Sequence, residues 1–274
     1  MRWLCFALAV LTLATVAYAE VAPATHSLAY RAIPGQTAVY RLTLRATGEQ
    51  LSLGERRPVR FEAEYEVRER ALSVEADGSF WLEASRRLLK VKDPAHLLNG
   101  NGEPTAPRIR LTSRGEVLEL ASPAATAGLR ERAAAALLGQ PQLVVLPATP
   151  VAAGAAWEWA KEGATQTNRL LAARDGVAEV TSRATRPVSL QDSSAALGLT
   201  TEVRGAVEQT STLQLELATG RVRRQWGTMT LRTSTEIGLT AETGPRSFHA
   251  ELRLRVTFDA KLLRVESASA EDRR

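Results

Sequence analysis

The sequence predicts an all-β protein in which long antiparallel strands form a large curved sheet or half-open barrel, with one central helix. Apolar and polar residues alternate with a period of two over long stretches, and short turn signals separate these stretches. Such alternation is typical of an antiparallel sheet with one buried and one solvated face. The stretch 248–259 alone is about twice as long as a typical strand, which favours a strongly curved sheet.

The segments 59–68 and 248–259 show the alternation most clearly. In the first segment, the apolar side chains from Val59 to Val67 share one face, and arginines and glutamates occupy the other. In the second, the apolar positions from Phe248 to Phe258 alternate with charged and polar ones. Both are therefore predicted to be strands whose apolar face points inward.

Turn signals join the predicted strands. Asp77-Gly78 and Asp175-Gly176 each lie between two alternating stretches, and Asp-Gly is a strong hairpin signal. Arg114-Gly115 and Thr219-Gly220 mark two further hairpins. The stretch 190–199, rich in serine and alanine, is predicted to be a loop.

One helix is expected near the middle of the chain. Ser122 can cap it, Pro123 suits its first turn, and Gly139 can end it. The predicted organisation, from the N-terminus, is a signal peptide (1–19), a linker (20–29), a first β-rich half (30–121), the helix (122–139), a second β-rich half (140–266) and a polar C-terminal tail (267–274).

The two halves carry the same order of signals. In each, a glycine precedes an aromatic strand, and an Asp-Gly hairpin and then a second glycine-containing hairpin follow. This order is consistent with a duplicated β unit. Chance recurrence is the alternative, because turn signals repeat in any antiparallel protein.

The N-terminus has the layout of a secretory signal peptide. A basic start at Arg2 precedes an apolar run, and Ala17-Tyr18-Ala19 before Glu20 forms a small-x-small cleavage site. The alternative, an uncleaved anchor, would need about 20 apolar residues. Cys5 lies inside the apolar run rather than at its end, so we expect an exported, periplasmic or secreted chain that is not lipid-anchored. No transmembrane helix is expected in the mature chain.

A short motif carries a family resemblance. The stretch 146–157 resembles the Pro-x-x-Pro-Val-x-x-Gly-x-x-Trp signature of uncharacterised exported bacterial β-rich proteins with two related halves. Many of those relatives are lipoproteins, and this chain departs from them by lacking a lipidated cysteine. The resemblance implies the fold and the compartment, and no catalytic residues. In architecture, the predicted sheet is also similar to the half-barrels of periplasmic lipoprotein carriers.

The residue patterns that usually mark catalysis or cofactor binding are missing from the sequence. The three histidines lie far apart, the sole cysteine lies in the signal peptide, and no nucleophile motif occurs, so we expect no catalytic residue, cofactor or metal. The net charge is +5, and its basic residues are interspersed with glutamates, which argues against a nucleic-acid partner.

Two sets of side chains are candidates for a site. Glu62, Glu64 and Glu66 form a carboxylate row that could hold an acid–base pair, but a solvated ladder with cross-strand arginines such as Arg253 and Arg255 is the simpler interpretation. Trp157 and Trp159 share one strand face and are the candidate apolar ligand surface, with core packing as the alternative.

We therefore predict a non-enzymatic, exported envelope protein that binds a hydrophobic ligand or a protein partner on a curved β-sheet. The partner would be a lipid or another envelope protein. Two alternatives stay open at this stage: an outer-membrane β-barrel, and an exported hydrolase whose site assembles only in space.

Overall fold

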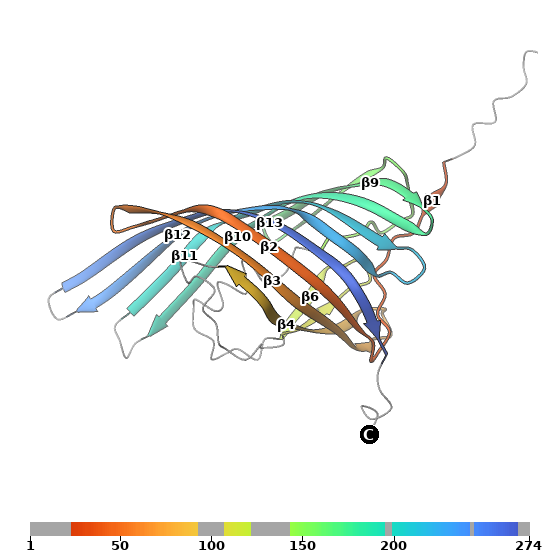
Figure 1. Cartoon of the computed structure of the whole chain (residues 1–274), viewed down its shortest axis with the longest axis horizontal. Helices are drawn as coiled ribbons and strands as arrows, with labels where there is room; N and C mark the ends of the chain where they lie inside the picture. The colour runs from red at the N-terminus through yellow and green to blue at the C-terminus, as the bar shows by residue number, and fades with distance from the viewer. Residues whose placement is uncertain (1–22, 93–106, 122–142, 195–198, 242–243, 268–274) are drawn as a thin grey trace, which may run out of the picture.

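The computed structural model describes residues 23–92, 107–121, 143–194, 199–241 and 244–267 (Figure 1). Most of them belong to strands, and eleven strands form one large sheet. The strands are β1 (Thr25–His26), β2 (Thr37–Ser52), β3 (Glu55–Val74), β4 (Phe80–Lys92), β5 (Arg108–Leu111), β6 (Val117–Ala121), β7 (Val151–Ala152), β8 (Ala156–Lys161), β9 (Ala164–Arg174), β10 (Val177–Ser194), β11 (Leu199–Glu216), β12 (Val222–Ala241) and β13 (Gly244–Glu266).

The sheet joins the two ends of the chain at its centre. Its strand order is β6-β5-β4-β3-β2-β13-β12-β11-β10-β9-β8, and each neighbouring pair is antiparallel. The chain runs outward from β2 to the edge strand β6, continues at the opposite edge with β8, and returns inward to β13. The pairing of β13 with β2, from Ala250 opposite Ser52 to Glu266 opposite Thr37, makes one sheet from both halves.

The predicted fold class is confirmed: the protein is all-β, and its long antiparallel strands form a large curved sheet (Figure 1). The predicted helix, residues 122–139, lies outside the described residues. In the described part of the chain, no helix has the length and apolar character needed to cross a membrane.

The inner face of the curved sheet carries two core clusters. The first combines inner side chains of β2, β3, β10, β11, β12 and β13, such as Leu42, Phe61 and Val256. The second combines side chains of β9, β10 and β11 with Phe80 of β4 and Leu111 of β5, and includes Leu28 and Tyr30 from the N-terminal segment as well as Val144 and Leu146. The alternation predicted for 59–67 is confirmed, whereas Phe248 in the last strand is 38% exposed.

Two segments that we expected to be irregular carry regular or buried structure. Thr25 and His26, within the expected linker 20–29, pair as β1 with β7, and Leu28 is buried in the second core cluster. The loop predicted over 190–199 is wrong at both ends, because β10 continues to Ser194 and β11 starts at Leu199. Pairing along the β10–β11 ladder outweighs the weak strand preference of serine there.

Tight turns connect the long strands. The predicted Asp175-Gly176 hairpin is confirmed, and both residues have positive φ, as a two-residue type I′ turn requires. The same geometry occurs at Leu53-Gly54 between β2 and β3 and at Glu162-Gly163 between β8 and β9. Neither of these two turns has the Asp-Gly signature, so the sequence pattern missed them.

Glycines at inner positions allow neighbouring strands to approach closely. A Cβ atom added to Gly48 would lie 1.9 Å from the Arg253 carbonyl oxygen on β13. At Gly205 and Gly227 the corresponding distances to the backbone oxygens of Arg232 and Thr210 are 2.1 Å. Glycine is therefore required where the ladder bends inward, as in other strongly curved sheets.

Replacing Gly48 with alanine should destabilise the sheet by about 3 kcal/mol, because the clash is with backbone that cannot move independently. The free energy of unfolding in urea measures this effect. Thr47→Ala, on the exposed outer face of the same strand, is the matched control and should change stability by less than about 0.5 kcal/mol. Equal stability of the two variants would contradict the role assigned to Gly48.

Candidate functional site

A partly open cavity of about 70 Å³ lies on the inner side of the sheet. By the volume that one buried water needs, it has space for about five water molecules. Aliphatic side chains dominate its wall, and they come from strands on both sides of the β2–β13 junction. The lining residues are Tyr40, Leu42, Val67, Glu69, Leu82, Ala84, Arg86, Ile109, Leu111, Leu143, Val222, Gln225 and Ala260.

One side of this wall is polar. Glu69 of β3 lies opposite Ala84 of β4. Arg86 lies two residues further along β4, on the same inner face, opposite Val67. On the other side of β3, Tyr40 of β2 pairs with Val67 and therefore lies diagonal to Glu69. Residues in such diagonal positions are within reach of long side chains. Glu69, Arg86 and Tyr40 therefore form a polar wall in a cavity whose other lining residues, apart from Gln225, are aliphatic.

Desolvation controls the charge of this polar wall. Burial raises the pKa of Glu69 to about 7, and the nearby Arg86 guanidinium acts in the opposite direction. Burial lowers the pKa of Arg86, while Tyr65 and Glu69 raise it. Burial also raises the pKa of Tyr40, and the Glu69 carboxyl adds to that rise. Glu69 is thus a carboxyl group that changes charge near neutral pH.

A buried segment closes one end of the inner face. Residues 143–146, which we call the strap, are extended but belong to no strand, and Val144, Val145 and Leu146 are each at most 3% exposed. Because buried backbone N–H and C=O groups need partners, a segment outside any ladder must find them elsewhere. The strap also contributes Leu143 to the cavity wall.

Side chains provide most of those partners, and the backbone carbonyl of Arg114 accepts from the Leu146 N–H at 2.8 Å. The Gln166 carboxamide accepts from the Val145 N–H at 2.9 Å and donates to the Leu143 carbonyl at 2.9 Å, as a neighbouring strand would. The Val145 carbonyl accepts from Trp157 Nε1 at 2.7 Å and from Asn168 Nδ2 at 3.2 Å. The Tyr30 hydroxyl donates to the Val144 carbonyl at 2.9 Å. These bonds hold the strap against β9.

The predicted ligand surface, Trp157 and Trp159, lies on the edge strand β8, and both side chains are part-buried. Trp157 packs against the second core cluster in addition to its bond to the strap. Neither tryptophan is among the residues that line the cavity. Their role as a ligand surface stays a prediction, and the predicted cleavage site at Ala17, Ala19 and Glu20 lies outside the described residues.

The carboxylate row Glu62, Glu64 and Glu66 lies on the outer face, away from the cavity. Two of its members form cross-strand ion pairs: Glu64 with Arg41 at 3.1 Å and Glu66 with Arg87 at 3.4 Å. These partners are on β2 and β4 rather than on β13 as we expected, because β13 pairs with β2 and not with β3.

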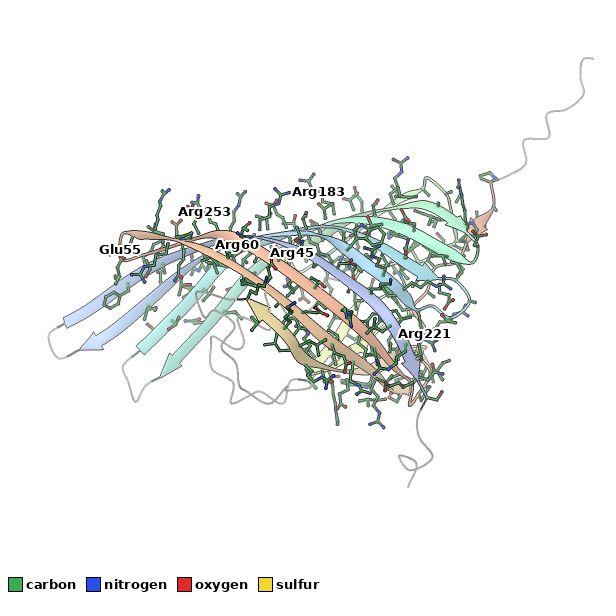
Figure 2. All side chains as sticks on the ribbon, viewed as in Figure 1. Arg45, Glu55, Arg60, Arg183, Arg221 and Arg253 are labelled. Atoms are coloured by element: carbon green, nitrogen blue, oxygen red, sulfur yellow. The ribbon has the colours of Figure 1, made fainter. Side chains whose placement is uncertain are left out.

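Other charged residues also lie on the outer face. Arg253 binds Glu251 within its own strand at 3.2 Å. Figure 2 shows Arg183 and Arg253 pointing away from the outer side of the curved sheet. Among the described residues, no three His, Cys, Asp or Glu side chains gather closely enough to hold a metal ion.

The polar wall and the strap contacts were not predicted, although the sequence pattern contained a signal for them. In β3, Glu69 is separated from Phe61 and Val67 by an even number of residues, so a charged residue was present on the apolar face of the strand. Gln166 and Asn168 likewise occupy inner positions of β9, with exposures of 6% and 1%. A polar residue that interrupts the apolar face of an alternating strand was the available clue.

The fold and the cavity define an open, curved antiparallel sheet with a small, partly open and largely aliphatic cavity on its inner face. No protein-family model matches the sequence, and no curated protein matches it. A solved structure described as lipid–protein interactions in lipovitellin is similar, with 11% sequence identity and a TM-score of 0.46. The match covers 87% of this chain and 26% of that chain, so this chain spans about a quarter of its length.

Removing the Gln166 carboxamide should release the strap. Gln166→Leu leaves the Val145 N–H and the Leu143 carbonyl without this partner, which should cost about 2–4 kcal/mol of stability. Hydrogen exchange of the Val145 amide should accelerate in parallel. Gln214→Leu is the matched control, because within the described part of the chain the Gln214 carboxamide bonds to Glu179 alone, at 3.4 Å and outside the core. It should leave both readouts near the wild-type values.

The stability of the protein should depend on the ionisation of Glu69. Because its folded-state pKa, about 7, exceeds the ordinary 4.5, the folded state binds more protons in this interval, and stability should fall as pH rises from 4.5 to 7. The loss from this group should approach about 3 kcal/mol and level off above pH 7. Urea unfolding across pH 4.5–8 measures it.

Glu69→Gln should remove this contribution to the pH dependence, because glutamine stays neutral throughout. Glu62→Gln, on the outer face of the same strand, should keep the wild-type profile. If the Glu69→Gln profile has the wild-type slope, another group is responsible for it.

Proposed function

We propose that this chain is a non-enzymatic, exported envelope protein that binds an apolar ligand on the inner face of its curved sheet. The observation that carries the proposal is the cavity, whose aliphatic wall is assembled from β2, β3, β4, β5, β12, β13 and the strap. Binding sites for small apolar molecules are concave, mostly hydrophobic and furnished with a few polar groups, and this cavity has each property.

The size of the cavity bears on how a ligand would bind. A space of about 70 Å³ holds only a segment of a long hydrocarbon chain. The wall residues Tyr40, Leu42 and Val67 also belong to the first core cluster, so the aliphatic surface continues from the cavity along the inner face. A longer chain would follow this surface only if the side chains packed against it moved aside.

Export rests on the N-terminal sequence. The apolar run and the Ala17-Tyr18-Ala19 ending support cleavage before Glu20 and transfer out of the cytoplasm. A binding role without a catalytic step is the simplest use of a wall that is mainly aliphatic.

Native mass spectrometry of the exported protein, purified without detergent, is the first test. We expect a bound apolar molecule at near one copy per chain, recovered by lipid extraction, on a polypeptide that begins at Glu20. Ala84→Leu, which places three additional carbon atoms in the cavity, should reduce the bound fraction at least about tenfold, because the ligand and the larger side chain need the same space. Ala206→Leu, on the outer face of β11, is the matched control and should retain the ligand.

A ligand-free mass for the wild type, together with no uptake of an added long-chain probe at micromolar concentration, would contradict the proposal. That outcome would favour the second candidate function, binding of a protein partner. The observation behind this candidate is the edge strand β6, where Val117, Leu118 and Leu120 are 46–62% exposed. Exposed apolar edge strands are natural sites for the addition of a partner's strand.

A further inference from the structure

The polar wall of the cavity is built from three neighbouring strands. Glu69, Arg86 and Tyr40 all extend from inner positions of β3, β4 and β2, and all three line the same space. The remainder of the wall is almost entirely hydrocarbon. A ligand that fills this cavity therefore meets charged and hydroxyl groups on one side and aliphatic groups on the other, which is the pattern that recognises an amphiphile.

We propose that this polar wall binds the carboxyl head of a long-chain carboxylic acid, with the hydrocarbon chain against the aliphatic wall. This inference rests on the proposed function and adds the chemical class of the ligand. Arg86 supplies a permanent positive charge and a planar set of donors that matches a carboxylate. Glu69 in its protonated form and the Tyr40 hydroxyl are further donors.

The balance of charge favours a carboxylate over other head groups. Without a ligand, the negative charge of ionised Glu69 balances the positive charge of Arg86. When a carboxylate enters, neutrality is kept if Glu69 takes one proton from solvent, so that Arg86 faces a single negative charge and the Glu69 O–H donates to it. A doubly charged phosphate would leave an excess negative charge, and burying an unbalanced charge is costly.

Glu69 is well placed to take that proton. The charged or titratable groups that act on it are Tyr30 from the N-terminal segment, Tyr40 from β2 and Arg86 from β4, and Arg221, after β11, acts on Tyr40. Burial raises the pKa of Tyr30 and of Tyr40, so both stay neutral at physiological pH. Because burial raises the pKa of Glu69 to about 7, one proton can be gained near neutral pH at small cost.

The test compares a fatty acid with its neutral ester. The full mature chain is titrated with cis-parinaric acid, a fluorescent long-chain acid, and with its methyl ester between pH 6 and 8.5. We expect the acid to bind about tenfold more weakly at pH 8 than at pH 6. At a pH above the pKa of Glu69, this side chain is ionised and must take up one proton when the acid binds. Binding of the ester should be independent of pH.

Two variants assign the effect. Glu69→Gln keeps a neutral donor, so it should bind the acid with the same affinity, within about twofold, at both pH values. Glu62→Gln, on the outer face of the same strand, should keep the tenfold change. Arg86→Met should lose the preference for acid over ester at pH 6, and if that variant fails to fold, the Glu69→Gln profile still decides the result.

The outcomes separate this inference from the proposed function. If acid and ester bind equally at every pH, or if Glu69→Gln retains the tenfold change, the carboxyl assignment is overturned while apolar ligand binding stands. If neither probe binds, the proposed function falls, and this inference falls with it. A pH-dependent acid, a pH-independent ester and a flat Glu69→Gln profile together support the assignment.

Discussion

The structure depends on one constraint: a sheet with a single apolar face must curve until that face is buried. Curvature is possible because Gly48, Gly205 and Gly227 occupy inner positions where the neighbouring backbone leaves no room for a Cβ atom. The first core cluster extends without a break over six neighbouring strands, from Phe61 on β3 to Val188 on β10.

The strap is subject to a second constraint, the hydrogen bonding of its buried backbone at the end of the curved sheet. A segment that crosses a buried apolar face cannot leave its amide groups without partners, and it has no adjacent strand to provide them. Gln166, Asn168, Trp157 and Tyr30 provide most of them, and Arg114 provides the partners of Leu146. Since the strap also carries Leu143 into the cavity wall, the same hydrogen bonds that stabilise the fold determine the shape of the candidate site.

Glu69 shows how a candidate site can conflict with stability. A carboxyl group in an apolar wall is desolvated, and its ionisation opposes folding at neutral pH. A leucine at this inner position would continue the apolar pattern of β3 without that cost. A residue that breaks the local rule is expected where function requires it. The same desolvation brings its pKa into the range in which a proton can be exchanged on ligand binding.

The sequence by itself determined the fold class, the faces of the long strands and four of the hairpins, because alternation and turn chemistry are local properties. It did not reveal that 190–194 and 25–26 are strands, since their pairing partners outweigh weak local preferences. Only the tertiary structure decided that β13 lies beside β2, that a glutamine replaces a strand along the strap, and that Glu69, Arg86 and Tyr40 share one cavity. The physical reason is that each of these depends on the register between distant segments, which no local pattern of residues encodes.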